Sequence, residues 1–347
     1  MQEPKRTEIS ELGEFGLIDR ISQNFEHHHQ SSVKGIGDDA AVLAATELQR
    51  VVTTDLLLEG IHFDLRYMPL QHLGYKAVAV NVSDVAAMNA IPTQITVSIG
   101  LSNRFSVEAV EALYEGIRAA CDNYKVDLIG GDTTSSGAGL VISVTALGEV
   151  AADKVALRTG AKKGDIVCVS GDLGAAFMGL QVLEREKAVF LSNPEARPEI
   201  DKYKYIVQRQ LKPDARMDIV HDLREKGVVP TSMIDVSDGL ASELLHLCKG
   251  SGVGLQVYEE NLPIDKMTYD TAVEFGVDPI TCVMNGGEDY ELLFTIRQED
   301  HEKLKSHPDI HFIGYATDLS GQAHLITKGG TIVPLKAQGF NHFTDNQ

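Results

Sequence analysis

The sequence predicts a folded protein of two domains, each of which mixes strands with helices. Its 347 residues correspond to roughly 2.3 times the usual ~150-residue domain. The apolar fraction of 43% and the charged fraction of 23% are close to the averages of globular proteins, which argues against a disordered, collagenous or coiled-coil chain. Strand-like and helix-like stretches occur in both halves, so we expect two hydrophobic cores.

The first half contains three stretches whose apolar residues recur at helical spacing, at 11–25, 74–90 and 107–124. Short apolar and β-branched runs predict strands at 40–43, 51–54, 95–101, 126–129 and 140–147. The run His27-His28-His29 lies in a polar stretch that we expect to be a solvated loop. The chain turns at Gly148-Glu149-Val150, and we place the boundary there, which gives domains 1–149 and 150–347.

The second half begins with a strand-to-helix turn marked by glycine. A buried strand at 165–170 passes through Gly171-Asp172-Leu173-Gly174 into a helix predicted over 175–183. Residues 184–213 are charged and contain prolines, which predicts an exposed connection. Beyond them we expect strands at 232–235 and 291–296 and a helix over 239–249.

The formal net charge of −19 indicates which partners the surface would reject. So acidic a chain repels nucleic acid and anionic lipid, and polyanionic partners would have to arrive with cations. The four cysteines form no C-x-x-C pair and lie in apolar surroundings, which predicts buried thiols in a reducing compartment. Neither a signal-peptide pattern nor eighteen consecutive apolar residues occur, so we expect a cytoplasmic protein.

Aspartates at the ends of apolar runs, beside glycine or hydroxyl residues, are the main chemical signal. They are Asp38, Asp39, Asp55, Asp132, Asp235 and Asp238, and Asp84 adds a carboxylate inside an Ala- and Val-rich helix, where Asp is unfavourable. Two like charges ~4 Å apart repel by about 4 kcal/mol at an effective dielectric near 20, so a shared cleft would need cations. The donors are hard oxygens, which favour Mg²⁺ over zinc or copper. Glycines at 130–131 and 171–174 would let backbone N–H groups approach phosphates.

Each of these features also has an ordinary structural interpretation. A single Gly-Asp pair is a common turn signal, Asp84 could pair with Lys76, and His62 could be an ordinary hydrogen-bonded histidine. Glu288 could be the tip of a hairpin, and Arg158 an exposed charge beside a turn. The stretch 35–40 fits G-x-G-x-x-A, but two acids stand where a pyrophosphate would approach. The sequence contains no Gly-Lys dipeptide, D-F-G, H-R-D, G-x-S-x-G or H-E-x-x-H, which excludes several familiar phosphate and hydrolase frameworks.

The ordered set of motifs resembles the thiamine-monophosphate kinase family over nearly the whole chain. The motifs are Gly35-Ile36-Gly37-Asp38-Asp39-Ala40, Thr53-Thr54-Asp55 followed by His62, Asn81-Val82-Ser83-Asp84, Gly130-Gly131-Asp132-Thr133-Thr134, Asp235-Val236-Ser237-Asp238-Gly239 and Gly286-Gly287-Glu288-Asp289-Tyr290-Glu291. The resemblance implies an α/β N-terminal domain like that of aminoimidazole-ribotide synthetase, followed by an α+β domain. It also implies a homodimer that forms through the N-terminal sheet, and direct phosphoryl transfer from ATP to thiamine monophosphate, giving thiamine diphosphate and ADP.

The resemblance further implies roles for matching residues. Mg²⁺ ions would be held by Asp39, Thr53, Thr54, Asp55, Asp84, Asp132, Asp235 and Asp238. ATP would contact Tyr114, Gly131, Asp132, Arg158 and Ser237. Thiamine monophosphate would contact His62, Glu288 and Phe340.

The chemistry of the acceptor agrees with this set. A phosphate monoester has a second pKa of about 6, so it is largely a dianion at neutral pH and needs no general base. Repulsion between two polyanions is then the obstacle, and bridging Mg²⁺ ions would relieve it. Two alternatives stay open at this point: another ATP-dependent enzyme of the same superfamily, such as a selenophosphate synthetase, and a nucleotide- or metal-binding module without turnover.

Overall fold

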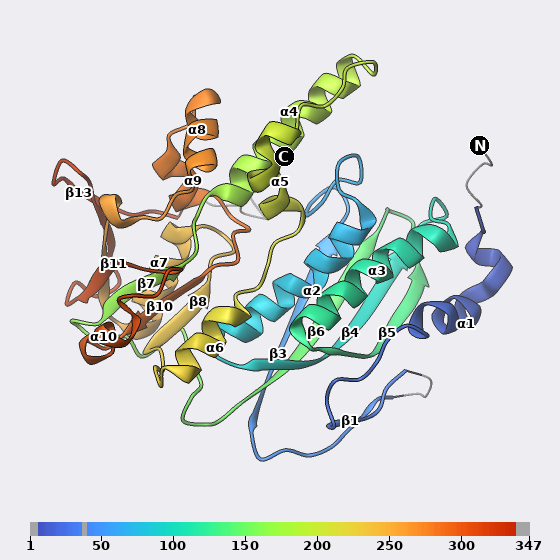
Figure 1. The fold of residues 1–347 in the computed structure, drawn as a ribbon, viewed down its shortest axis with the longest axis horizontal. Helices are drawn as coiled ribbons and strands as arrows, with labels where there is room; N and C mark the ends of the chain where they lie inside the picture. Colours follow the sequence, from blue (N-terminus) through green and yellow to red (C-terminus); the bar gives the residue numbers. More distant parts are fainter. Residues whose placement is uncertain (1–5, 37–39, 338–347) are drawn as a thin grey trace. The chain divides into compact units, whose positions relative to one another are not determined.

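The computed structural model describes residues 6–36 and 40–337 (Figure 1). The chain divides into two compact units. Unit 1 comprises Met1–Val85 and Ala90–Ala152, and unit 2 comprises Ala86–Asn89 and Asp153–Gln347. The assignment of separate functions to 1–149 and 150–347 stays a prediction.

Unit 1 is an α/β layer built on a four-stranded sheet of order β3-β6-β4-β5, in which β4 and β5 are parallel. Its strands are β3 (Gln49–Leu58), β4 (Ile91–Leu101), β5 (Asp127–Ser135) and β6 (Val141–Val150). The helices are α1 (Ile9–Ser22), α2 (Leu70–Ala87) and α3 (Val107–Tyr124), and a small hairpin joins β1 (Ser32–Lys34) to β2 (Val42–Leu43). Figure 1 shows α2 and α3 lying together along this sheet. The helices and strands expected in the first half are therefore confirmed, with shifted ends.

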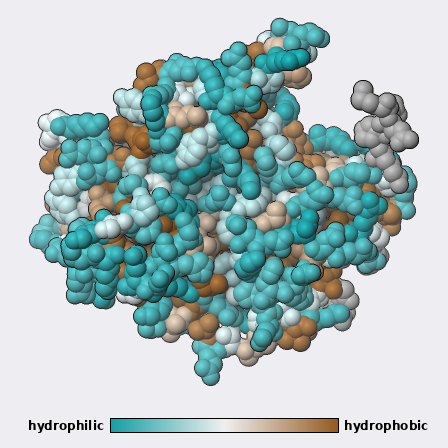
Figure 2. Space-filling model, viewed as in Figure 1, coloured by the Kyte–Doolittle hydropathy of each residue, from teal (hydrophilic) through white to brown (hydrophobic). Residues whose placement is uncertain are grey.

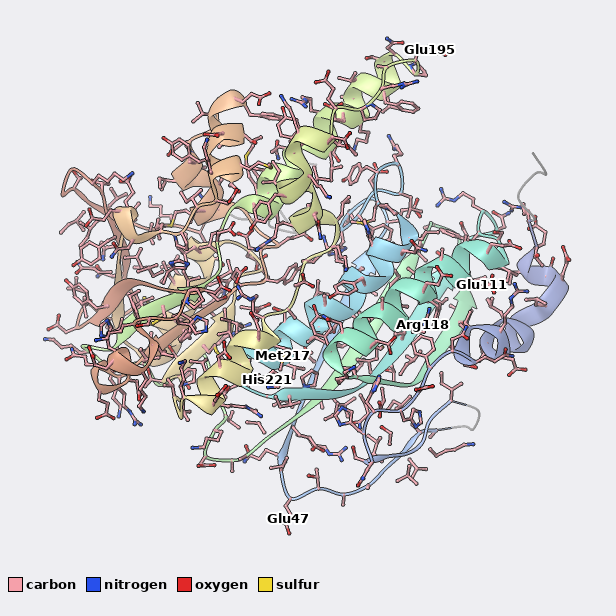
Figure 3. All side chains as sticks on the ribbon, in the orientation of Figure 1. Glu47, Glu111, Arg118, Glu195, Met217 and His221 are labelled. Atoms are coloured by element: carbon pink, nitrogen blue, oxygen red, sulfur yellow. The ribbon has the colours of Figure 1, made fainter. Side chains whose placement is uncertain are left out.

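Two glycines allow α2 and α3 to touch through their backbones. A Cβ atom on Gly74 would lie 2.0 Å from the carbonyl oxygen of Leu113, and one on Gly116 would lie 1.9 Å from that of Gln71. Any side chain at either position would force the helices apart. On the other side of α3, Glu111 pairs with Arg20 of α1 (Figure 3).

The two faces of β3 have different environments because side chains alternate along a strand. Val52 and Leu56 are 65% and 51% exposed on the face that includes Thr54. Thr53 and Asp55 face the opposite way and are bonded to residues of α2. The chemistry of this strand therefore lies on its helix side, and its other side presents apolar residues to the surroundings.

The loop that contains His27 to His29 is anchored rather than simply solvated. The backbone N–H groups of His28 and His29 both donate to the fully buried carboxylate of Asp127. The ring Nε2 of His29 lies 2.6 Å from the carbonyl oxygen of Lys125. These contacts hold the stretch before β1 against the start of β5.

Unit 2 is an α+β unit with a seven-stranded sheet of order β13-β12-β9-β11-β7-β10-β8, mostly antiparallel. Its strands are β7 (Ile166–Ser170), β8 (Ser232–Asp235), β9 (Gly254–Tyr258), β10 (Leu292–Ile296), β11 (Ile310–Thr317), β12 (Ala323–Ile326) and β13 (Ile332–Pro334). Its helices are α4 (Ala175–Ser192), α5 (Lys204–Leu211), α6 (Met217–Glu225), α7 (Leu240–Ser251), α8 (Lys266–Glu274), α9 (Pro279–Asn285) and α10 (His301–Leu304). A hydrophobic core lies between α7 and the strands β7, β8, β9, β10, β11 and β12.

The expectation of an exposed connection at 184–213 is confirmed for its middle, where most residues from 188 to 202 are exposed, and is wrong for its two ends. Helix α4 continues to Ser192, and α5 buries Ile206, Val207 and Leu211. These three apolar residues occupy one face of a short helix whose other positions are mostly polar or charged. The composition averaged over the stretch is therefore polar, and it did not predict a helix. The contact with α4 requires Gly179, where a Cβ atom would lie 2.0 Å from the carbonyl oxygen of Ile206.

The predicted environment of the cysteines is confirmed. Cys121, Cys168, Cys248 and Cys282 are all buried free thiols. Hydrophilic residues cover most of the face drawn in Figure 2, with hydrophobic ones scattered among them, as the acidic composition predicts. None of the helices in the described ranges combines the length and hydropathy of a membrane span.

Candidate active site

In unit 1, the edge strand β3 and helix α2 bring two carboxylates together. The hydroxyl of Thr53 donates to Oδ2 of Asp84 at 2.5 Å. The backbone N–H of Asp55 donates to Oδ1 of Asn81 at 3.1 Å, and the fully buried Asn81 donates in turn to the carbonyl oxygen of Ala77. Asn81 therefore fixes β3 against α2, so that Asp55 and Asp84 face the same space.

The surroundings of Asp55 shift its pKa. Burial, and secondarily the charge of Asp84, raises the pKa of Asp55 to about 6. Such a pair stores electrostatic repulsion that a divalent cation would relieve. Carboxylate and hydroxyl oxygens are the ligands that Mg²⁺ prefers, so the donor set fits this ion.

Among the residues that the structure describes, neither unit assembles three or more side chains into a protein cage for a metal. Within residues 6–36 and 40–337, no three His, Cys, Asp or Glu side chains converge in a way that could hold an ion. Mg²⁺ commonly takes only one or two carboxylates and completes its shell with water and substrate phosphates. The pair Asp55 and Asp84 is compatible with that kind of site.

Thr54 and Asp132 do not belong to this cluster. Oγ1 of Thr54 donates to the carbonyl oxygen of Val144 at 3.1 Å and accepts from Thr145, on the other face of the sheet. Asp132 is exposed on β5 and pairs with Ser98 of β4. The row of paired residues that crosses the sheet at this level lies on the same face as Thr54. The structure thus places the sheet between these two side chains and Asp55.

Gly131 lies on β5 where no side chain fits. A Cβ atom there would come within 1.8 Å of the carbonyl oxygen of Val97 on β4. Gly131 is nevertheless exposed, so its backbone is accessible from the side that faces away from Val97. An exposed backbone without a side chain is the feature that a phosphate-binding segment needs.

His62 and Tyr114 are both held by neighbours within unit 1. Nδ1 of the half-buried His62 accepts the backbone N–H of Leu58 at 3.0 Å, so the proton of the neutral ring is on Nε2. The ring of Tyr114 on α3 meets Phe25 edge to face, with centroids 6.3 Å apart. Burial raises the pKa of Tyr114 well above its usual value, so it is a neutral hydroxyl at physiological pH.

In unit 2, two sequence-distant loops form the second cluster. The backbone N–H of Val236 donates to the carbonyl oxygen of Glu291, that of Tyr290 to Val236, and that of Glu288 to Ser237, over 2.7–2.9 Å. Asp235 is buried at the end of β8, whereas Asp238 is exposed and Ser237 is intermediate. These bonds place the two motifs, Asp235–Gly239 and Gly286–Glu291, side by side.

Glu243 is a member of this cluster that the sequence reasoning missed. It is 2% exposed in the first turn of α7, and its Oε1 accepts the backbone N–H of Asp238 at 3.0 Å. Burial above all raises its pKa to about 8, and the charges of Asp238 and Asp235 add to this, whereas Arg158 opposes it. Arg158 is thus close enough to act on the same carboxylate. An acid in the first turn after Asp-Gly was the available signal.

Glu288 is an anchored residue rather than a free hairpin tip. It has a backbone φ of 66°, and Tyr290 has one of 54°, so both adopt the left-handed conformation that non-glycine residues avoid. Oε2 of Glu288 accepts a hydrogen bond from the side-chain amide of Gln210 at 2.6 Å. Backbone strain of this kind is concentrated at functional sites.

The expectation that the turn Gly171–Gly174 presents the N-terminus of a helix to a phosphate is wrong. The carboxylate of Asp289, which lies between Glu288 and Tyr290, accepts the backbone N–H groups of Gly174 and Ala176. The carboxyl group of Asp289 therefore already occupies the N-terminus of α4. Asp39 and Phe340 lie outside the described residues.

Known proteins resemble this chain over nearly its whole length. Residues 37–150 match the family described as AIR synthase related protein, N-terminal domain. The chain is 35% identical over 340 residues to thiamine-monophosphate kinase of Bacillus subtilis (strain 168), which covers 96% of this chain and 100% of that protein.

Two solved structures are similar in both sequence and fold. Thiamine-monophosphate kinase from Stenotrophomonas maltophilia K279a has a TM-score of 0.76 at 34% identity, covering 90% of this chain and 96% of that one. A structure described as AaThiL complexed with AMPPCP and TMP has a TM-score of 0.74 at 34% identity, covering 99% and 100%. These similarities extend over both units.

Proposed function

Because the chain belongs to the thiamine-monophosphate kinase family, we propose that it transfers the γ-phosphoryl group of ATP to thiamine monophosphate, giving thiamine diphosphate and ADP. It is an ATP-dependent phosphotransferase. Near-complete coverage at 35% identity is the observation that carries this conclusion. It favours the kinase over both the synthetase and the module without turnover.

We propose that the metal is Mg²⁺ and that aspartates of this chain hold it. When bound, Mg²⁺ ions would neutralise and align the phosphate groups of the two substrates. The raised pKa of Asp55 supports this, since burial and, secondarily, the charge of Asp84 both disfavour its ionised form in the absence of a cation. Thr54 and Asp132 lie on the other face of the sheet from Asp55, so in this role they would hold a different ion. The residues in this role are Asp39, Thr53, Thr54, Asp55, Asp84, Asp132, Asp235 and Asp238. Of these, the pair Asp55 and Asp84 has the strongest structural support.

The remaining residues bind and orient the substrates. Those proposed for ATP are Tyr114, Gly131, Asp132, Arg158 and Ser237, and those for thiamine monophosphate are His62, Glu288 and Phe340. The acceptor dianion needs no proton removed, so none of these residues acts as a base. Glu288 supplies a negative charge suited to the cationic thiazolium ring, and Nε2 of His62 can donate a hydrogen bond.

We propose that the protein is a cytoplasmic homodimer. The exposed Val52 and Leu56 on the outer face of β3 support an interface through the sheet of unit 1. Sedimentation of the purified chain should give twice the monomer mass, and Leu56→Glu should lower it, whereas a monomeric wild type would refute the dimer. The four buried free thiols support a reducing compartment.

The assay that tests the function compares three acceptors in parallel. With Mg²⁺ and ATP, we expect thiamine diphosphate and ADP from thiamine monophosphate, but not from thiamine or without acceptor. Slow ADP release that thiamine monophosphate leaves unchanged would instead identify a nucleotide-binding protein. Loss of product with a chelator and its return with added Mg²⁺ would establish the metal requirement.

A further inference from the structure

The hairpin of α4 and α5, to which the sequence analysis gave no role, contacts the loop that contains Glu288. The chain leaves α4 at Ser192, turns near Glu195 and returns as α5 (Figure 3). Gly179 brings α5 close, since a Cβ atom there would lie 3.1 Å from Cβ of Gln210 as well as 2.0 Å from the backbone of Ile206. The position of Gln210 is therefore set by backbone-to-backbone packing of the two helices.

Gln210 holds the carboxylate of Glu288 directly. Its side chain is 3% exposed, and its Nε2 donates to Oε2 of Glu288 at 2.6 Å. A hydrogen bond to an ionised acceptor is stronger than one between neutral groups. A buried donor on a packed helix also has little freedom to move, so it restricts the rotamer of the glutamate that it holds.

The neighbouring residue Arg209 holds the backbone of the same loop. Its Nη2 donates to the carbonyl oxygens of Asp289 at 3.1 Å and Asp172 at 3.3 Å, and it pairs with Oε1 of the buried Glu291 at 3.0 Å. These contacts surround a stretch with two left-handed non-glycine residues, Glu288 and Tyr290. Since such a backbone persists only when its surroundings stabilise it, α5 is part of what maintains the loop.

We propose that Gln210 is a positioning residue for recognition of thiamine monophosphate, acting through the carboxylate of Glu288. This rests on the proposed function, in which Glu288 contacts that substrate. Gln210 orients the carboxylate of Glu288 before the substrate binds, so that substrate binding itself does not have to restrict the rotamer of Glu288. Gln210 acts on the side-chain carboxylate of Glu288, whereas Ser237, proposed for ATP, contacts the backbone of Glu288, so we expect Gln210 to affect recognition of thiamine monophosphate more than that of ATP.

The test replaces Gln210 by methionine, which keeps its length and volume but removes the donor. The matched control is Gln208→Met, because Gln208 is an exposed glutamine on the same helix. With purified full-length protein, Gln210→Met should raise KM for thiamine monophosphate about tenfold, as loss of one positioned hydrogen bond does. KM for ATP and kcat should change less than about twofold, as in the control.

A second variant and a double-mutant cycle separate positioning from a general folding effect. Gln210→Glu places a second carboxylate against Glu288 and should raise KM for thiamine monophosphate further than Gln210→Met. In a Glu288→Ala background, Gln210→Met should have no additional effect, since its partner is absent. The inference is overturned if Gln210→Met matches Gln208→Met, or if its effect persists unchanged in that background.

Direct binding distinguishes failure of this inference from failure of the proposed function. Calorimetric titration with thiamine monophosphate, without ATP, should show weaker binding for Gln210→Met than for the wild type. A wild type that forms no thiamine diphosphate refutes the proposed function. A fully active wild type whose binding is unaffected by Gln210→Met refutes the positioning role alone. If Gln210→Met and Gln208→Met both unfold at a lower temperature than the wild type, Gln210→Glu decides between positioning and a general folding effect. A purely structural loss would raise KM for both substrates, whereas loss of positioning would raise KM for thiamine monophosphate alone.

Discussion

The carboxylate of Asp289 accepts the backbone N–H of Gly174 at 2.7 Å, across 115 positions of sequence. It also accepts that of Ala176 at 3.2 Å, so one buried side chain satisfies two donors at the N-terminus of α4. The loop that contains Glu288 and the first turn of α4 are thereby joined. This relationship allows a test of the loop that does not depend on substrate.

Asp289→Ala should destabilise the protein by about 2 kcal/mol, since it removes a helix cap and leaves buried donors without an acceptor. The contact of Arg209 with this residue goes to its backbone carbonyl and would remain. Thermal and urea unfolding would measure the change. Asp318→Ala serves as the control, because Asp318 is an exposed aspartate of the same unit. Equal midpoints for both variants would show that the cap does not stabilise the fold.

Asp55→Asn and Asp84→Asn should each lower kcat by a factor of about 100 or more, because each removes a proposed ligand of the metal that aligns the phosphates. Folding should be retained, since neither change creates a cavity. Phosphoryl-transfer assays and circular dichroism would measure the two effects. Asp19→Asn, on the exposed side of α1, is the matched control. A near wild-type rate in either test variant would reject the metal assignment.

The stabilisation of the protein by Mg²⁺ should depend on pH through Asp55. Its pKa in the folded state is about 6, above the ~3.9 of an unfolded chain. Without metal, the folded state therefore binds more protons between about pH 4 and 6, and this carboxyl lowers the unfolding free energy as pH rises through that window. Metal binding requires the carboxylate, so the thermal shift on adding Mg²⁺ should be larger at about pH 7.5 than at about pH 5. Asp55→Asn should flatten this dependence, and an unchanged profile would assign it to other groups.

His62→Asn separates the structural and substrate roles of this histidine. An asparagine can keep an acceptor near the backbone N–H of Leu58, which Nδ1 now binds, but it lacks Nε2. We expect KM for thiamine monophosphate to rise about tenfold, with KM for ATP nearly constant. Steady-state kinetics with each substrate varied in turn would measure this. Equal increases for both substrates would contradict the proposed contact.

Several parts of the fold followed from local patterns. Helix α3 begins and ends at the predicted residues, Val107 and Tyr124, because its apolar stripe and its N-cap Ser106 are contained in one stretch of chain. Strand β8 likewise spans its predicted residues, 232–235. By contrast, α5 was missed because charged residues cover the face that does not pack on α4.

The sequence by itself determined the family and the types of residue at the site, because those depend on which side chains occur and in what order. Only the tertiary structure decided which of them meet. The pairs Asp84 with Thr53 and Glu288 with Gln210 involve contacts between elements that are far apart in the sequence. Strand alternation in the formed sheet also decided that Thr54 faces away from Asp55. Local sequence patterns determine whether a stretch forms a helix or a strand. Which other elements it packs against depends on the packing of the whole chain, which no short stretch of sequence specifies.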